Sequence, residues 1–372
     1  MPRGGRRMPN PYAEAGVDTA AGDLAVELMK SAVSATHNTS VLGGVGGFAG
    51  LYDVSFLKDF SRPLLATSTD GVGTKVAIAQ AIDKHDTIGQ DLVGMVVDDI
   101  VVVGAKPMFM TDYIACGRVV PARIADIVAG IARGCAATGT ALVGGETAEH
   151  PGLLGPDDYD VAGAAVGAVE ASDVLGAPLV LDGDVVVAIA SSGLHSNGYS
   201  LVRHILGQRG VGYTDQLPEF GSVSVGEALL EPTRLYTTPL LSVIDALPGA
   251  VHSLSHVTGG GIAANLARVL PVGSWVEVDR STWEPLPVFR VLASMSGTPI
   301  EDTEGTWNLG IGMFAVVSAS SATAVVDALG AAGLPSWPVG VVSKSSRDLD
   351  GFEQGAKGVD GGAVRLTGTY AG

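Results

Sequence analysis

Leu64-Leu65-Ala66-Thr67-Ser68-Thr69-Asp70-Gly71-Val72-Gly73-Thr74-Lys75 joins a short apolar run to a glycine-rich turn that ends in a lysine. The run from Leu64 to Thr69 predicts a strand, and Asp70 begins the turn. A carboxylate at a strand end can hold Mg²⁺, which prefers oxygen ligands. The two glycines let backbone N–H groups approach a phosphate closely, and Lys75 can neutralise one of its oxygens as a point charge. We therefore expect this segment to form part of a phosphate site.

Taken alone, the same segment is equally compatible with a hairpin turn that carries an exposed lysine. It lacks the Gly-x-x-x-x-Gly-Lys-Ser/Thr spacing of a Walker A loop, and short glycine motifs often occur without a ligand. The interpretation therefore depends on what the rest of the chain places beside it.

Segments on both sides of this stretch alternate between strand-like and helix-like patterns. With 372 residues, 47% of them hydrophobic and 5% aromatic, the chain is long enough for two domains of mixed α/β (α+β) type. In the first half we expect a glycine loop over 43–50, a helix over 86–103, a strand over 108–115, a helix from Pro121 to near Gly139, a strand over 140–143 closed by Gly144-Gly145-Glu146, and a strand over 160–169.

The turn-rich stretch over 170–184 marks the expected domain boundary. Beyond it we expect strands over 185–190, 251–257 and 313–317, helices starting near Gly198 and over 262–270 and 320–332, a mobile polar loop over 343–362, and a last apolar stretch over 363–366. The predicted organisation is a disordered extension over 1–11, an N-terminal domain over 12–170, a C-terminal αβ domain over 171–342 and a tail over 343–372.

Charge and cysteine content exclude several classes of protein. The formal net charge of −17 argues against nucleic-acid binding, because the phosphate backbone would be repelled. A phosphate site in this chain must rest on local positive potential from a metal ion, a lysine or helix N-termini. Cys116 and Cys135 form no metal-ligand spacing and no disulfide framework, and no apolar run approaches the ~20 residues that span a bilayer. We expect a cytoplasmic protein that does not enter the membrane.

Three carboxylates, Asp91, Asp98 and Asp99, interrupt an otherwise apolar stretch that predicts a helix. Asp91 and Asp98 lie two turns apart on one helix face. Burying a carboxylate without a partner is costly, so these acids should have one, and a metal ion would serve. Capping or salt bridging is the alternative, and the apolar surroundings favour the metal.

Three further segments place polar groups beside predicted strand ends or helix starts. In Gly144-Gly145-Glu146-Thr147, Glu146 follows a strand directly, as ligand groups often do in α/β proteins, although an ordinary polar loop would look the same. Ser192-Gly193-Leu194-His195-Ser196-Asn197 sets an imidazole, hydroxyls and an amide before a helix. His195 could move a proton near neutral pH, whereas a simple N-cap explains only one of these residues. Thr258-Gly259-Gly260-Gly261 is a weaker candidate for an anion cradle.

In their order along the chain, these segments resemble the aminoimidazole ribonucleotide synthetase family, also called phosphoribosylformylglycinamidine cyclo-ligase. The resemblance covers about residues 12–341 and rests on Tyr12-Ala13-Glu14-Ala15-Gly16-Val17-Asp18, Asp70 to Lys75, Gly89-Gln90-Asp91-Leu92-Val93, Gly144 to Gly152, His195 to Tyr199 and His256 to Gly261. It implies a homodimer of two-domain subunits whose N-terminal sheets pair across the dimer, with ATP near the domain junction. It also implies ATP-dependent ring closure of formylglycinamidine ribonucleotide to aminoimidazole ribonucleotide, ADP and phosphate.

The resemblance implies roles for the candidate residues, with ATP and Mg²⁺ as the bound groups. The expected catalytic residues are Asp70, Lys75 and His195. The expected metal ligands are Asp70, Asp91, Asp98 and Asp99. The expected contacts to ATP or substrate are Gly71, Gly73, Thr74, Gly144, Gly145, Glu146, Thr147, Ser196, Asn197, Thr258, Gly259, Gly260 and Gly261. Family members usually carry Asn-Asp at positions 98–99, so the extra carboxylate blurs which of the two is the ligand.

Other members of the same superfamily fit less well. Selenophosphate synthetase normally needs a reactive Cys or selenocysteine near its N-terminus, and no Cys precedes Cys116. The larger amidotransferase of the same pathway is far longer. Thiamine-phosphate kinase is shorter and lacks the segments over 144–152 and 195–199. A nucleotide-binding protein without catalysis is the remaining alternative, and the presence of every candidate metal and phosphate group argues against it.

Overall fold

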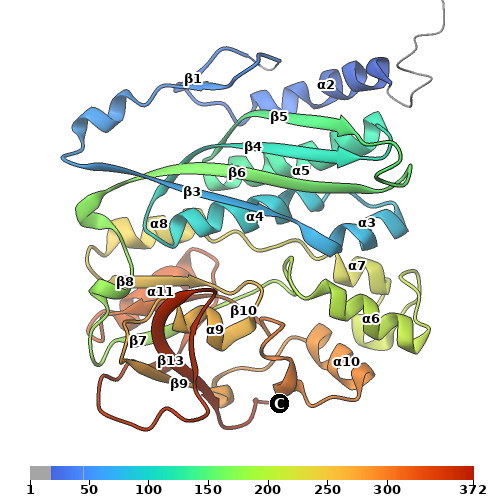
Figure 1. The fold of residues 1–372 in the computed structure, drawn as a ribbon. Helices are drawn as coiled ribbons and strands as arrows, with labels where there is room; N and C mark the ends of the chain where they lie inside the picture. Colours follow the sequence, from blue (N-terminus) through green and yellow to red (C-terminus); the bar gives the residue numbers. More distant parts are fainter. Residues whose placement is uncertain (1–17, 45) are drawn as a thin grey trace, which may run out of the picture.

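The computed structural model describes residues 18–44 and 46–372, and Figure 1 shows the two halves that they form. The expected extension over 1–11 and residues 12–17 of the first family marker lie outside the described residues. Both halves combine helices with sheets, which confirms the mixed α/β class. Within the described ranges, no helix is both long enough and apolar enough to cross a membrane.

The first half is built around one sheet. Its elements are α2 (Thr19–Ser34), β1 (Val41–Leu42), β2 (Leu51–Tyr52), η1 (Ser55–Asp59), β3 (Pro63–Gly71), η2 (Gly73–Lys75), α3 (Val76–Ile82), α4 (Ile88–Val101), β4 (Lys106–Cys116), α5 (Pro121–Thr138), β5 (Ala141–Glu149) and β6 (Tyr159–Glu170). The strand order is β3-β6-β4-β5, with β4 and β5 parallel and the other neighbours antiparallel. Helices α4 and α5 pack against this sheet (Figure 1).

Strand alternation gives the sheet a helix-covered face and an open face. Along β6, Val161, Gly163 and Ala165 are buried, and the residues between them are partly exposed. The pairing register places Asp70 of β3 and Asp112 of β4 opposite Gly163, on its two sides. Both carboxylates therefore belong to the helix-covered face, which is how a strand-end aspartate comes to point toward α4.

The second half contains two sheets. Its elements are η3 (Ala171–Asp173), η4 (Ala177–Leu179), β7 (Val185–Ala190), α6 (Tyr199–Arg209), η5 (Pro218–Phe220), α7 (Val225–Leu229), α8 (Thr237–Ala246), β8 (Val251–His256), α9 (Gly261–Ala267), β9 (Trp275–Asp279), η6 (Arg280–Thr282), α10 (Pro287–Ser296), η7 (Ile300–Thr303), β10 (Ile311–Val317), α11 (Ala322–Ala331), β11 (Ser336–Val341), β12 (Glu353–Ala356) and β13 (Val359–Thr367). One sheet is antiparallel, in the order β11-β7-β10-β8. The other has the order β12-β13-β9, with β13 parallel to β9.

Most expected elements are present, but two expectations are wrong. Helix α5 begins at Pro121, where a missing N–H costs nothing, and ends before Gly139, whose φ is 70°. Strand β5 does not end at 143. It runs on to Glu149, because its backbone continues to pair with β4 after a register shift. The expected loop over 343–362 contains β12 and the start of β13, because the edge of β9 offers β13 backbone partners.

One large cluster of buried apolar side chains runs through both halves, from Ala25 in α2 to Leu366 in β13. Helix α4 lies at its centre and is buried along almost all of its length. Two of its buried residues are the carboxylates Asp91 and Asp98. The helix that carries the acids therefore lies between the first sheet and the second half.

Asp91 and Asp98 hold the segment that leads into α8. Asp91 Oδ1 accepts hydrogen bonds from the backbone N of Thr233 at 2.8 Å and from its Oγ1 at 2.7 Å. Asp98 Oδ1 accepts from the N of Tyr236 at 3.0 Å and from the N and Oγ1 of Thr237 at 2.9 and 2.7 Å. These charge-assisted bonds offset the cost of burying the carboxylates and fix the two halves against each other. These hydrogen bonds from the segment before α8 to Asp91 and Asp98 are called the α4 clamp below.

We expect Asp98→Ala to lower the free energy of unfolding by about 2–4 kcal/mol, because the buried N–H groups of Tyr236 and Thr237 would lose their acceptor. Chemical denaturation with and without Mg²⁺ measures this loss. The matched control, Asp245→Ala, removes only an exposed ion pair with Lys106 and should cost less than about 1 kcal/mol. A loss of stability found only in the presence of Mg²⁺ would contradict the α4 clamp and indicate metal binding by Asp98.

Candidate functional site

Lys75 lies fully buried at the end of η2, in the junction between the two halves. Its ammonium donates hydrogen bonds to Asp91 Oδ1 at 2.8 Å and to the carbonyl oxygen of Glu231 at 2.7 Å. It also lies 5.6 Å from the ring centroid of Tyr199. Burial lowers the pKa of Lys75, and the charge of Asp91 opposes that shift. The glycine turn thus delivers the lysine into a buried ion pair, which rules out the exposed hairpin.

The burial of Asp91 and Asp98 is explained by protein partners. Burial raises the pKa of Asp98 to about 6, although His256 and the donors at Thr237 and Tyr236 oppose the shift. Only Oδ2 of Asp91 lacks a hydrogen-bond partner. The burial of both acids therefore requires no metal ion, because the capping and salt-bridging alternative accounts for it, and metal binding by Asp91 and Asp98 stays a prediction.

Asp70 and Asp99 lie close enough at this junction for their charges to interact. Asp70 Oδ1 accepts a hydrogen bond from the backbone N of Gly71 at 2.7 Å. Asp99 Oδ1 lies 2.9 Å from Nδ1 of His256, and 42% of the Asp99 side chain is exposed. Burial raises the pKa of Asp70, and the charge of Asp99 raises it further. A cation between the two carboxylates would relieve that repulsion.

His256 is a site residue that the sequence argument treated only as part of a family marker. Burial lowers the pKa of this imidazole, but the hydrogen bond and charge of Asp99 outweigh burial, so its pKa lies above the ordinary value. Its Nε2 is buried without a hydrogen-bond partner. A donor in that position is available to an anionic ligand.

His195 lies in the loop between β7 and α6, at a φ of 60° that non-glycine residues seldom adopt. Its Nε2 is 3.2 Å from the backbone N of Ser192 and accepts that hydrogen, so the ring proton is assigned to Nδ1. Burial, with the nearby charge of His256, holds the pKa of His195 well below its usual range. Nδ1 and the neighbouring Ser196 Oγ are buried without partners. His195 is thus a neutral imidazole that presents an N–H.

Tyr236 lies between the two histidines and Asp98 of the α4 clamp. Its ring centroid lies 6.0 Å from that of His195 and 6.4 Å from that of His256. Its hydroxyl donates to the carbonyl oxygen of Ala190 at 2.9 Å. A Cβ at Gly312 of β10 would overlap this hydroxyl and lie 2.5 Å from His195 Cε1. A glycine inside an apolar strand was the one sequence signal for this close approach.

The turn over 258–261 lies beside the His195 loop. A Cβ on Gly259 would be 3.5 Å from Asn197 Oδ1. The Asn265 amide donates to the carbonyl oxygens of Gly261 at 2.7 Å and of Thr258 at 3.1 Å, which holds the turn from inside. Tertiary structure therefore brings together two polar segments that are far apart in the sequence.

Residues 144–147 line a separate hollow of about 270 Å³, together with α2 and the glycine loop. In the same hollow lies Asp112, which the sequence argument missed and whose only signal was a lone acid in an apolar strand. A Cβ on Gly145 would overlap its Oδ1, and burial raises the pKa of Asp112 to about 7. The register aligns Asp70, Gly163, Asp112 and Gly145 across four strands, so Asp112 is two strands, or about 10 Å, from Asp70.

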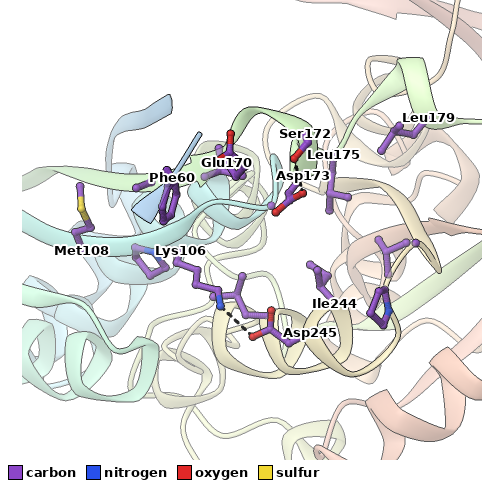
Figure 2. A pocket seen from close by; sticks show the side chains of 18 of the residues that line it. Phe60, Lys106, Met108, Glu170, Ser172, Asp173, Leu175, Leu179, Ile244 and Asp245 are labelled. Atoms are coloured by element: carbon purple, nitrogen blue, oxygen red, sulfur yellow. Dashed lines mark hydrogen bonds and ion pairs between the residues drawn. The ribbon is translucent and has the colours of Figure 1, made fainter. Parts of the chain in front are cut away.

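A larger hollow, of about 940 Å³, lies elsewhere (Figure 2). Several of its charged lining groups already have partners: Lys106 pairs with Asp245 at 3.0 Å, and Glu170 accepts hydrogen bonds from the backbone N of Ser61 at 2.7 Å and of Arg62 at 2.9 Å. Glu170 pairs with Pro63 at the start of β3, and Asp70 lies roughly 23 Å further along that extended strand. We do not assign the reaction to this hollow.

Among the described residues, no three His, Cys, Asp or Glu side chains converge to hold a metal ion by themselves. Mg²⁺ is usually held by one or two carboxylates together with phosphate oxygens and waters. Asp70 and Asp99 fit a metal ion shared with a nucleotide, and the unpartnered polar atoms of His195, Ser196 and His256 fit an anionic ligand at the same junction.

Two family models match this chain. The N-terminal domain model of AIR synthase related proteins matches residues 54–169, and the C-terminal domain model matches residues 182–348. A phosphoribosylformylglycinamidine cyclo-ligase of Alkaliphilus oremlandii is 43% identical over 91% of this chain and 98% of its own length. The chain belongs to the phosphoribosylformylglycinamidine cyclo-ligase family. A cyclo-ligase of Synechocystis sp. is 45% identical over 89% of this chain and 96% of its own length.

Solved structures share the cyclo-ligase fold at low sequence identity. The hydrogenase maturation protein HypE of E. coli superposes with a TM-score of 0.61 and 20% identity, over 95% of this chain and 94% of its own. The thiamine-monophosphate kinase of Stenotrophomonas maltophilia gives 0.61 and 18%, over 92% and 97%. The predicted boundaries at 170 and 342 stay predictions. Strands β12 and β13 both lie wholly beyond the matched residues.

We expect the free energy of unfolding of this cyclo-ligase to fall as the pH rises from 4 to 7, because of the shifted pKa of Asp112. Its folded-state pKa of about 7 exceeds the ordinary 3.8, so the folded chain binds the proton more tightly, and that stabilisation is lost as the pH rises through 7. The difference in the free energy of unfolding between Asp112→Asn and the wild type should rise by about 2 kcal/mol in favour of the variant from pH 5 to pH 8. Denaturant titrations at both values measure it.

Asp327→Asn, an exposed substitution on α11, is the matched control and should leave the pH profile unchanged. Parallel pH profiles for the wild type and Asp112→Asn would show that Asp112 ionises in the folded chain as readily as in the unfolded one.

Proposed function

We propose that this chain catalyses the ATP-dependent ring closure of formylglycinamidine ribonucleotide to aminoimidazole ribonucleotide, with release of ADP and phosphate, in de novo purine biosynthesis. The cyclo-ligase relatives carry this activity in their name. The observation that carries the proposal is the convergence of Asp70, the Asp99–His256 pair and the His195 loop at one domain junction. We place this reaction in the cytoplasm.

Mg²⁺ and the ATP phosphates fit the carboxylate side of this junction. Asp70 and Asp99 would hold the ion, because their mutual repulsion is relieved by a cation, and Glu146 stays a weaker candidate. Asp91 and Asp98 are left out of this set because protein donors occupy them. When bound, Mg²⁺ supplies positive charge to the transferring phosphoryl group.

The backbone of the glycine turn would bind phosphate oxygens. Gly73 has a φ of 72° and open space where a side chain would lie, so its N–H is accessible to an anion. Gly71 and Thr74 flank it in the same turn. Lys75 contributes its charge from the buried pair with Asp91, as a fixed field rather than a direct contact. Of the residues over 144–147, Gly145 lies in the same cross-strand row as Asp70, and Glu146 follows it in β5.

The histidine side of the junction would bind the substrate ribonucleotide. Neutral His195 would donate through Nδ1, and His256 through Nε2, to oxygens of the substrate. Ser196, Asn197 and the turn over 258–261 add hydroxyl, amide and backbone groups around them. A neutral imidazole donates a proton poorly, so we assign His195 to orientation and His256 to charge stabilisation.

Purified protein supplied with formylglycinamidine ribonucleotide and Mg–ATP should form aminoimidazole ribonucleotide and ADP in equal amounts. Asp70→Asn should keep the fold and lower kcat by at least about tenfold, equivalent to ~1.4 kcal/mol in the barrier. Asp327→Asn is the matched control and should turn over normally. ADP formed without the ring-closed product would overturn the proposed activity, and near-normal turnover by Asp70→Asn would remove Asp70 from the site.

We also propose that the enzyme is a homodimer that pairs through the open face of the first sheet. Large apolar side chains lie exposed in this half, among them Leu65 at 64% and Leu51 at 60%. Light scattering should give twice the 37.6 kDa of one chain. Leu65→Asp should shift the mass toward the monomer, and Val272→Asp, exposed on the second half, should not. A monomeric wild type would contradict the proposal.

A further inference from the structure

Residues 368–372, called the terminal segment below, pack back onto the second half. The ring of Tyr370 meets that of Trp283 edge to face, with 5.1 Å between the ring centroids. The backbone N of Ala371 donates to the carbonyl oxygen of Trp283 at 3.1 Å, and Arg290 of α10 donates to the carbonyl oxygen of Ala371 at 3.1 Å. Figure 1 marks this end of the chain close to α10. The terminal segment lies beyond the residues that the family models match, so those models do not describe its role.

The hydroxyl of Tyr370 reaches a largely buried ion pair. It donates a hydrogen bond to Oε1 of Glu304. The same carboxylate accepts from Arg280, whose Nε lies 2.6 Å from Oε1 and whose Nη2 lies 2.8 Å from Oε2. Burial, together with the hydrogen bond and charge of Glu304, raises the pKa of Tyr370, so the hydroxyl stays protonated and remains a donor. Glu304 is therefore held from two sides.

The backbone of Glu304 supports the turn over 258–261. Its carbonyl oxygen accepts a hydrogen bond from the backbone N of Ile262 at 3.0 Å. A Cβ on Gly261 would lie 1.7 Å from that oxygen, so the two backbones are in direct contact. A shift of Glu304 would therefore move one of the two segments predicted to bind the ligand on the histidine side of the junction.

Residues 304–309, called the backing segment below, also support the loop between β7 and α6. A Cβ on Gly198 would lie 2.4 Å from Cδ1 of Trp307, and Nε1 of Trp307 donates to the carbonyl oxygen of Gly198 at 3.4 Å. The side chain of Asn308 donates to the carbonyl oxygen of Gly193 at 2.8 Å. The backing segment thus contacts both segments that line the histidine side of the junction.

The backing segment ends at a strained residue. Leu309 is fully buried and has a φ of 47°, in the left-handed region that leucine seldom adopts. Its carbonyl oxygen accepts a hydrogen bond from Nε1 of Trp283 at 3.1 Å, and Trp283 is the residue on which the terminal segment packs. Strain of this kind persists only where the surrounding structure enforces it, and it is concentrated at functional sites. The terminal segment therefore acts on the backing segment at both of its ends.

We propose that the terminal segment positions the substrate side of the active site, because Tyr370 fixes Glu304 and thereby the backing segment behind the two ligand-binding segments. Tyr370 and Glu304 are positioning residues: they act through the backbone that they hold, and we assign them no contact with the ligand. The inference rests on the proposed function, since it takes the loop between β7 and α6 and the turn over 258–261 to bind the ribonucleotide. Asp70 and the glycine turn belong to the first half, so nucleotide binding should depend on the terminal segment much less.

The test uses the whole chain with Tyr370→Phe, which removes one hydroxyl and keeps the ring against Trp283. KM for formylglycinamidine ribonucleotide should rise by about threefold or more, whereas KM for Mg–ATP and kcat should each change by less than about twofold. A raised KM at constant kcat is the sign of lost ground-state binding. Calorimetric titration with the ribonucleotide alone should give a matching rise in Kd.

Hydrogen exchange in the ligand-free protein measures the positioning itself. The amide of Ile262 should exchange about threefold faster or more in Tyr370→Phe, because its acceptor on Glu304 is held less firmly. The amide of Val72, which donates to the carbonyl oxygen of Val161 in the first half, should keep its wild-type rate. Glu304→Gln should raise KM for the ribonucleotide at least as much. Adding Tyr370→Phe to that variant should have little further effect, because the hydroxyl acts through the carboxylate.

Glu277→Gln is the matched control for a general loss of stability. It removes a carboxylate of β9 that pairs with Arg347 and Arg365 in the same half of the molecule, and it leaves the contacts of Glu304 and Tyr370 in place. This variant should lower the melting temperature without changing KM for the ribonucleotide or the exchange of the Ile262 amide.

Three results would overturn the inference. Unchanged KM values and unchanged Ile262 exchange in Tyr370→Phe would show that the terminal segment does not position the site. Equal rises in KM for both ligands, in Tyr370→Phe and Glu277→Gln alike, would show a general loss of structure. A rise for Mg–ATP alone would place the backing segment on the nucleotide side. If the wild type does not close the ring but Tyr370→Phe still speeds Ile262 exchange and weakens ribonucleotide binding, the proposed reaction is overturned and the positioning role stands.

Discussion

Asp91 and Asp98 project from one face of α4, and each accepts hydrogen bonds from a turn of the second half that lies far away in the sequence. A buried carboxylate is tolerated only when donors surround it, and buried N–H groups are tolerated only with acceptors. Each side of this contact therefore requires the other. Lys75 adds its ammonium to Asp91, so the glycine turn of β3 is tied into the same buried network.

The candidate site depends on this clamp for its geometry. Asp98 holds the backbone of Tyr236, and the Tyr236 ring packs between His195 and His256. His256 in turn pairs with Asp99, the next residue along α4. Helix α4 thus fixes the positions of the second half and of both imidazoles. It also carries Asp99, one of the two carboxylates proposed to contact the ligand. Asp98, which holds the second half, and Asp99, which would face the ligand, are adjacent on α4, so the packing of the two halves also sets the shape of the site.

Apolar periodicity and helix-end residues predicted most of the elements, because both depend on interactions between residues that are close together in the sequence. Apolar periodicity located β7 and α4, and the helix signals of Pro121 and Gly139 bounded α5. The expectations that were wrong concern pairing between distant strands. Glycines over 144–145 read as a turn, yet β4 offered them a continuous partner. The polar stretch over 343–362 reads as a loop, yet the edge of β9 organised it into a hairpin.

The sequence by itself determined the family, the mixed α/β class and which segments carry polar groups, because motif order and periodicity are properties of the chain. Only the tertiary structure decided what each charged group faces. Asp91 and Asp98 look like metal ligands in the sequence, and the structure places the donors of Thr233 and Thr237 against them. The reason is physical: the energy of a charge depends on its neighbours in space, and those neighbours come from distant parts of the chain.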